Sequence, residues 1–197
     1  MLTTDIQPGV LLVGLGPLIN GGKPGIDGHY RVVRIGPQVV IEFFDTVPGG
    51  PGEFPVKILP YRTNEINSMT VGNVECISGE FTGCVMTLYR QDSAVKAGHV
   101  DTNSDTSQRA VYDRMKQTGA ITVLDEYDTT AKLQQYPQLT GATRILCVAS
   151  GRTVIHYFVD KETHNYSGNI PVPGEKGKVQ FGLKSETRYR VLHAHGI

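Results

Sequence analysis

Glycine and proline divide this chain into many short apolar segments. The sequence holds 23 glycines and 11 prolines among 197 residues, and the segments between them are rich in Val, Ile, Phe and Tyr. Because these residues favour strands while Gly and Pro favour turns, the pattern predicts a largely β structure built from short strands. The predicted strands cover residues 10–15, 30–35, 39–44, 56–61, 74–78, 83–89, 99–101, 120–124, 144–149, 153–159, 179–183 and 189–193.

One of the connections is predicted to be a tight hairpin. Ser150-Gly151-Arg152 separates the apolar segments 144–149 and 153–159. Glycine supplies the positive φ that a tight turn requires. We therefore expect these two strands to pair antiparallel.

The best helical pattern lies between Asp105 and Gln117. Asp105 or Ser107 can cap the first amides, and Gly119 follows the last turn. The spacing predicts a narrow apolar stripe that packs on a sheet, formed by Ala110, Val111, Arg114 and Met115. A second short helix is expected between Asp128 and Pro137.

These elements predict an α+β fold with mixed, largely antiparallel β-sandwich-like sheets and one or two packed helices. The length suits one substantial core, so residues 1–197 are expected to form a single domain. No apolar run approaches the roughly 20 residues that span a bilayer, so no membrane partner is expected. Nineteen basic residues balance nineteen acidic ones, which argues against a nucleic-acid partner.

Three cysteines form an odd set without paired metal-ligand spacing. Cys76, Cys84 and Cys147 therefore predict neither a disulfide framework nor a zinc site, and we expect no cofactor. A hairpin disulfide between Cys76 and Cys84 is conceivable. Cys147 lies in a continuous apolar run, which indicates a buried, unreactive thiol.

Cys84 and His99 are the residues with the clearest potential for chemistry. Thr82-Gly83-Cys84 places a thiol at a bend before an apolar run, and His99 opens the next strand-like run fifteen positions later. An adjacent imidazole can take the thiol proton and hold the resulting ion pair, which makes Cys84 a candidate nucleophile and His99 its base. The alternative is a buried structural Cys84 with an unrelated surface His99.

The surrounding segment resembles a known family of enzymes. Residues 55–60, 69–74, 81–84 and 98–101 occur in the order found in Burkholderia lethal factor, a toxin that deamidates a glutamine of a host translation-initiation helicase. The segment is also similar to the catalytic domain of cytotoxic necrotizing factor and to the chemoreceptor glutamine deamidase. The resemblance spans about residues 53–104.

The resemblance implies roles for individual residues. The family's nucleophile falls on Cys84 and its histidine on His99. Close relatives have a hydroxyl residue six positions before the nucleophile that orients the histidine, and here that residue is Ser78. Asp101 lies two positions after His99 and so on the same strand face, which offers a Cys-His-Asp arrangement as the alternative. We favour Ser78, because a neighbour on the same strand often points alongside the imidazole rather than at it.

This chemistry predicts hydrolysis of a carboxamide. Cys84 would attack the amide carbon. Gly83 allows a sharp bend, and main-chain amides at this bend would stabilise the oxyanion. Thr82 would line the pocket mouth or merely satisfy the bend. Water would then hydrolyse the thioester to a carboxylate, whereas an amine in place of water would give transglutamination.

Two functions from different classes follow. The first is a cysteine-dependent protein-glutamine deamidase whose partner is a protein bearing the target glutamine. The second is a non-catalytic β-rich binding protein that keeps the fold with an idle thiol. The resemblance implies a bacterial effector or toxin, made in the bacterial cytoplasm and then secreted or delivered into a target cell. The first residues show no secretory signal, so export would use a dedicated apparatus. We expect the protein to be a monomer.

Overall fold

The computed structural model describes residues 1–102, 107–129, 143–171 and 179–195. The helices are α1 (Leu2–Asp5), α2 (Leu15–Ile19) and α3 (Ser107–Gln117). The strands are β1 (Leu11–Val13), β2 (Ile26–Ile35), β3 (Gln38–Phe44), β4 (Glu53–Leu59), β5 (Ile66–Thr70), β6 (Cys76–Phe81), β7 (Val85–Gln91), β8 (Ala94–Val100), β9 (Thr122–Asp128), β10 (Thr143–Ser150), β11 (Thr153–Pro171) and β12 (Val179–His195). None of the described helices is long and apolar enough to cross a membrane.

Eight of these strands close into a barrel. Their order around it is β1-β12-β11-β10-β6-β4-β2-β3, and β3 returns to β1. The pairs β1·β3 and β4·β6 are parallel, and the other neighbours are antiparallel. Closure gives each of these strands two neighbours within the barrel and leaves the barrel itself without an open edge.

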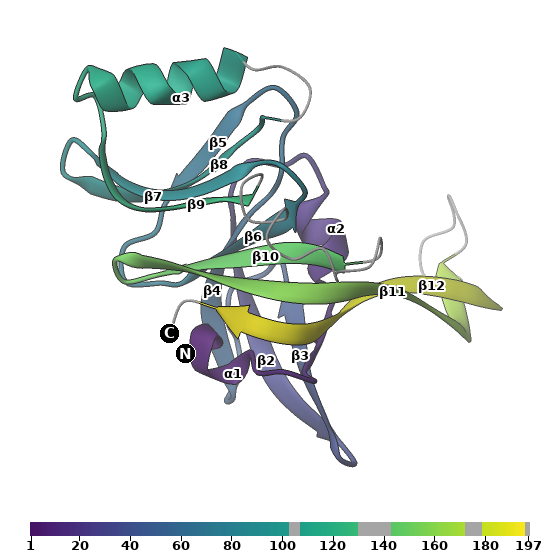
Figure 1. Ribbon diagram of the computed structural model, residues 1–197. Coiled ribbons are helices and arrows are strands. Elements are labelled where there is room, and N and C mark those ends of the chain that lie inside the picture. Colours follow the sequence, from purple (N-terminus) through teal and green to yellow (C-terminus); the bar gives the residue numbers. More distant parts are fainter. Residues whose placement is uncertain (103–106, 130–142, 172–178, 196–197) are drawn as a thin grey trace.

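The remaining strands form a second sheet, in the order β5-β8-β7-β9, that is antiparallel throughout. Along the chain β5 lies between the barrel strands β4 and β6, and β7 to β9 lie between β6 and β10. The four strands of this sheet are therefore inserted between barrel strands in two separate segments of the chain. Figure 1 shows it lying over the β6 and β10 side of the barrel, with α3 on its far side.

Three apolar clusters hold the layers together. The first fills the barrel with side chains from its strands, such as Ile41 and Tyr157, and takes in Leu2 of α1 and Leu15 of α2. The second lies between the barrel wall and the inserted sheet, and the third lies between that sheet and α3. Each large apolar side chain buried in this way contributes roughly 1.5–3 kcal/mol to the free energy of unfolding.

Strand β10 is buried on both faces. Leu146 and Val148 point into the barrel cluster, whereas Ile145, Cys147 and Ala149 join the cluster under the inserted sheet. This explains why residues 144–149 read as a continuous apolar run instead of an alternating one. The hairpin predicted at its end is confirmed: Ser150 pairs with Thr153 in antiparallel register, and Gly151 has φ 61°.

Glu80 on β6 ties several elements together. Its side chain is 10% exposed and accepts hydrogen bonds from Lys161 Nζ at 2.8 Å, Tyr189 Oη at 2.7 Å and Asn20 Nδ2 at 3.1 Å, while Arg144 Nε lies 3.1 Å away. Burial alone would raise the pKa of Glu80, but the hydrogen bonds from Lys161, Tyr189 and Asn20 outweigh it and lower the pKa. A buried carboxylate with these partners joins α2 to four barrel strands.

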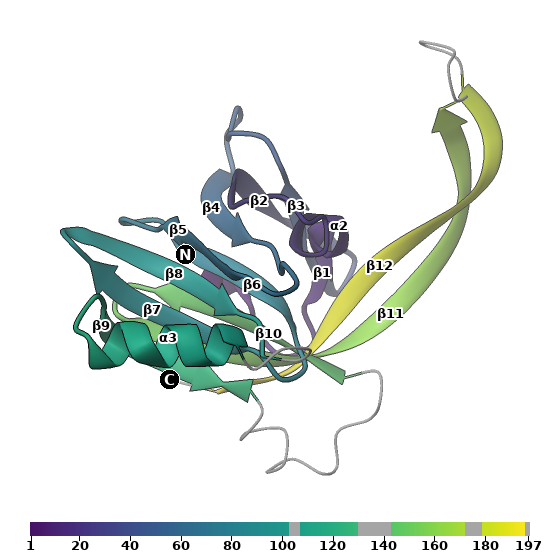
Figure 2. The same cartoon turned by 90° about the horizontal axis from the view of Figure 1, so that it is seen from above.

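Strands β11 and β12 extend beyond the barrel as a two-stranded arm. Among the described residues, β10 pairs with β11 as far as Asp160, and β1 pairs with β12 from Arg188 onward. Past these points the described residues of the two strands pair with each other out to the Pro171 and Val179 pair. Figure 2 shows the arm leaving the body of the molecule. Phe181 and Leu183 on β12 are exposed.

The predicted fold class was wrong. The chain is mostly β, with 59% strand and 12% helix, and combines an eight-stranded closed barrel with a four-stranded sheet instead of forming an α+β sandwich with packed helices. The sequence pattern fails here because alternating or short apolar strands look the same in a sandwich and in a barrel. Closure depends on the pairing of β1 with both β3 and β12, which are far apart in the chain.

The helix at Ser107–Gln117 exists, but its predicted apolar stripe was wrong at three of its four residues. Ala110, Val111 and Arg114 are exposed, and the helix instead buries Tyr112 against the inserted sheet, with Met115 beside it. The second predicted helix, between Asp128 and Pro137, falls largely on residues 130–142, outside the described residues.

Candidate active site

The predicted site residues come from both layers of the molecule. Ser78 lies on β6 of the barrel, His99 lies on β8 of the inserted sheet, and Cys84 immediately precedes β7. All three are buried, with exposed fractions of 0% for Ser78 and Cys84 and 1% for His99. The site therefore lies at the interface between barrel and sheet.

Cys84 and His99 lie on the same face of the inserted sheet. Met86 pairs with His99 and Val85 with Val100, so Cys84 lies diagonally across from His99 and opposite Asp101. Cys84 and Met86 belong to the cluster that faces the barrel, whereas Val85 and Val100 belong to the cluster under α3. Diagonal neighbours across an antiparallel ladder are close enough for side chains to interact.

The loop that carries Cys84 is fixed by hydrogen bonds to its main chain. The carbonyl of Cys84 accepts from Thr129 Oγ1 at 2.7 Å and from Thr129 N–H at 3.2 Å. The carbonyl of Gly83 accepts from Thr102 Oγ1. Gly83 is buried and Thr82 is exposed. Their predicted roles, an oxyanion site and a pocket mouth, stay predictions.

Ser78 contacts the imidazole of His99 and determines its tautomer. Ser78 Oγ donates to the carbonyl of Leu59 at 2.6 Å and lies 2.9 Å from His99 Nδ1. A hydroxyl has one proton, so Oγ accepts from Nδ1–H. Nε2 then carries the lone pair, and it has no hydrogen-bond partner among the described residues. A neutral imidazole with a free Nε2 is the form that a general base requires.

Aromatic rings enclose the imidazole of His99. Phe81 stacks on it with ring centroids 4.0 Å apart and an interplanar angle of 19°, and Tyr61 lies at 5.3 Å on a tilt. Burial lowers the pKa of His99 to about 3, although the nearby Asp101 charge opposes the shift. The imidazole is therefore neutral in this closed site, which does not favour the resting thiolate–imidazolium pair expected from the sequence.

Asp101 contacts the nucleophile rather than supporting the imidazole through a bond at Nδ1. Its Oδ1 accepts from Cys84 Sγ at 3.8 Å, and its Oδ2 accepts from the main-chain N–H of Asn64 at 2.7 Å. Burial raises the pKa of Tyr61, and the charge of Asp101 and its hydrogen bond to the Tyr61 hydroxyl add to the increase. Ser78, the preferred candidate for orienting His99, is the residue that bonds Nδ1.

The other two cysteines lie outside the site. Cys76 and Cys147 are buried, and all three cysteines are free thiols, so the conceivable Cys76–Cys84 disulfide is not formed. Burial raises the pKa of Cys76 to about 12 and that of Cys147 well above its ordinary value. Neither thiol is suited to react near neutral pH.

Sequence reasoning gave no role to several residues that shape the site. Phe81 and Tyr61 enclose the imidazole, Thr129 fixes the Cys84 loop, and Asn64 bonds the carboxylate of Asp101. Phe81 could have been noticed because it lies three positions before Cys84, within the segment that carries the resemblance. The others follow from pairing between segments far apart in the chain.

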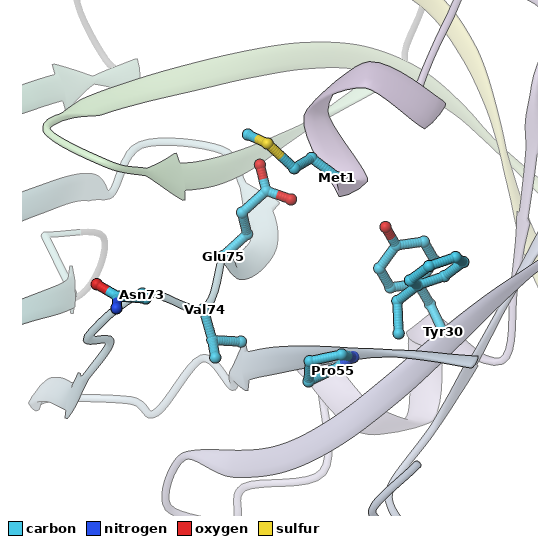
Figure 3. A pocket seen from close by; sticks show the side chains of 7 residues that line it. Met1, Tyr30, Pro55, Asn73, Val74 and Glu75 are labelled. Atoms are coloured by element: carbon cyan, nitrogen blue, oxygen red, sulfur yellow. The ribbon is translucent and has the colours of Figure 1, made fainter. Parts of the chain in front are cut away.

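A separate cavity of about 190 Å³ lies beside α1 and contains none of the predicted site residues. Figure 3 shows Glu75 pointing toward Met1, with Tyr30 and Pro55 on the other side of the space. The Glu75 carboxylate is already engaged, because it accepts from Thr3 Oγ1 at 2.6 Å and from main-chain amides at the start of α1. It serves to cap that helix.

In the parts of the chain that the structure describes, no three metal-ligating side chains come together. No protein-family model matches the sequence, and comparison with curated proteins finds no match.

Proposed function

We propose that this protein is a cysteine-dependent protein-glutamine deamidase. The observation that carries the proposal is the hydrogen bond from His99 Nδ1 to Ser78 Oγ, which leaves Nε2 as a base on the sheet face that also bears Cys84. The resemblance of residues 53–104 to known deamidases supports the same assignment. It also supports a bacterial effector or toxin as the kind of protein.

The reaction would proceed in two stages. His99 Nε2 takes the thiol proton as Cys84 Sγ bonds to the carboxamide carbon, and the imidazolium then protonates the amide nitrogen. The C–N bond breaks and ammonia leaves a thioester. Next, Nε2 takes a proton from water, and the hydroxide attacks the thioester carbon. The C–S bond then breaks, the imidazolium returns the proton to Sγ, and a glutamate is the product.

Access to the site requires movement of the side chains that cover Cys84, since Sγ is fully buried. Opening the site to a substrate also admits water. Because burial is the main cause of the low His99 pKa, hydration raises this pKa toward its ordinary value and makes the imidazole a stronger base. Base strength is thus linked to substrate access.

A non-catalytic binding protein is the second candidate function. Two observations favour it: Cys84 is completely buried, and its thiol donates a hydrogen bond to Asp101. Both are typical of an unreactive thiol. Transglutamination would use the same thioester with an amine as acceptor, and mass spectrometry separates the two products.

The test compares wild type, Cys84→Ser and Cys76→Ser in lysates from several kinds of host cell. We expect wild type and Cys76→Ser to convert a specific glutamine to glutamate, a gain of about 1 Da, and Cys84→Ser to lose this activity, because its hydroxyl is too weakly acidic for His99 to activate. Cys76→Ser is a matched control, since Cys76 is equally buried but lies outside the site. Absence of any Cys84-dependent conversion, with all three proteins folded by circular dichroism, would leave the binding protein as the better assignment.

A further inference from the structure

Asp101 is a buried acidic group whose position the Cys84–His99 chemistry does not explain. It is 1% exposed, yet its carboxylate accepts from the thiol of Cys84 and from the main-chain amide of Asn64, and its charge contributes to the raised pKa of Tyr61. Hydrogen-bond donors on a carboxylate stabilise its ionised form. The site thus holds a fixed negative charge beside the nucleophile.

That charge does not help to generate a thiolate. A carboxylate next to a thiol opposes its ionisation, because the product would be a second negative charge at the same place. Oδ1 of Asp101 lies 3.8 Å from Sγ of Cys84 and accepts a hydrogen bond from the protonated thiol. A role in activating Cys84 would place the carboxylate on His99 instead, where Ser78 already occupies Nδ1.

The position suits the leaving group of the reaction. When His99 takes the thiol proton, the S–H···O contact between Cys84 and Oδ1 is lost. In the tetrahedral intermediate the amide nitrogen is two bonds from Sγ, so an acceptor 3.8 Å from Sγ can lie at an N–H···O distance of about 3 Å from that nitrogen. The substrate's N–H can then replace the S–H on Asp101.

We propose that Asp101 selects a carboxamide over a carboxylate by accepting an N–H of the substrate's amide nitrogen. This inference rests on the proposed function, since it assigns the substrate specificity of the same site. The second amide proton stays on nitrogen, which receives the proton from His99 and leaves as ammonia when the C–N bond breaks. After hydrolysis the product carboxylate faces Asp101, and repulsion between like charges expels it.

Two alkylating reagents test this selection without any deamidation. Iodoacetamide carries a carboxamide and iodoacetate a carboxylate. In both cases Sγ bonds to the CH₂ carbon, iodide leaves and His99 takes the thiol proton. We would measure the ratio of the two alkylation rates at Cys84 by mass spectrometry in wild type, Asp101→Asn and Asp113→Asn, with free cysteine as the reference. The ratio cancels any change in the thiolate fraction, because both reagents need the same thiolate.

We expect the ratio in wild type and in Asp113→Asn to exceed that of free cysteine by about tenfold or more, since the carboxylate of iodoacetate meets a like charge beside Asp101. In Asp101→Asn it should fall back toward the free-cysteine value. Asparagine keeps the shape and an acceptor for Asn64, and circular dichroism checks the fold.

A wild-type ratio equal to that of free cysteine would overturn the proposal, whatever the variants do. An unchanged ratio in folded Asp101→Asn would do the same, and so would a Cys84 that neither reagent labels, because a site that admits no carboxamide cannot select one. Asp101-dependent selectivity without deamidation in lysates would count against the proposed function alone.

Discussion

The hydroxyl of Ser78 decides which nitrogen of His99 keeps its proton. Because Oγ gives its only proton to Leu59, it can offer His99 a lone pair and nothing else. In Ser78→Ala both the Leu59 carbonyl and Nδ1–H lose a buried partner. We expect a loss of about 1–3 kcal/mol in the free energy of unfolding and a shift of the neutral imidazole toward the Nε2–H tautomer.

Nitrogen NMR of ¹⁵N-histidine-labelled protein distinguishes the two tautomers directly. Ser150→Ala is a suitable control, because Ser150 lies at the end of β10 and donates to Glu75 rather than to His99. If the Nδ1–H form dominated equally in wild type and Ser78→Ala, the role assigned to Ser78 would have to be abandoned.

The sequence made Cys84 and His99 candidates for one site through their positions at strand starts, and it pointed to Ser78 only through the resemblance to known deamidases. It could not predict the partner of Asp101. Alternation along a strand places Asp101 on the face of His99, but the carboxylate reaches Cys84 because the β7–β8 register puts these two residues opposite each other. That register depends on pairing at Ala94 and Val95, in a stretch that carries no strong strand pattern.

At the scale of elements, Tyr112 anchors α3 to the inserted sheet. Its side chain is buried, and its hydroxyl lies 2.7 Å from Thr87 Oγ1 and donates to Glu126 at 2.6 Å. The apolar periodicity of the helix pointed to Val111 instead. One aromatic ring with a satisfied hydroxyl buries more surface than several small residues, so a single Tyr determines which face packs.

We expect Tyr112→Phe to lower the free energy of unfolding by about 1–3 kcal/mol, because the change leaves the buried hydroxyl of Thr87 without its partner and removes one donor from the half-buried Glu126. Val111→Ala on the exposed face should change it by no more than about 0.5 kcal/mol. Urea denaturation of the two variants measures both values. Equal losses would mean that the two faces of α3 contribute alike.

For the whole molecule, His99 links stability to pH. Its ordinary pKa of 6.5 falls to about 3 in the folded protein because of burial. Above about pH 6.5 the imidazole is neutral in both states and its full contribution is present. As the pH falls toward 3, the unfolded chain binds a proton that the folded protein refuses, so the free energy of unfolding decreases by up to about 1.4 kcal/mol per pH unit.

Denaturation of wild type and His99→Gln at pH 7 and pH 5 measures this effect as the difference between their pH dependences. We expect a weaker dependence in His99→Gln, whatever its absolute stability, and no change in His164→Gln, whose imidazole lies exposed on β11. Identical pH dependence in wild type and His99→Gln would show that His99 does not couple stability to pH.

The positions of most strands could be predicted from the sequence, but the architecture could not. Strand β5 was missed because Ile66–Thr70 alternates weakly, and it forms by pairing with β8. The arm was predicted as separate short strands, since the described residues beyond Asp160 are largely polar. Their pairing comes from the opposite strand of the hairpin rather than from burial.

The hydrogen bond between Ser78 and His99 joins two layers that are held together mainly by apolar packing. The site is thus complete only when both layers have folded, since the barrel supplies the hydroxyl and the inserted sheet supplies the imidazole and the thiol. A chain in which only one layer has reached its final structure contains every residue of the site and lacks the bond that sets its base.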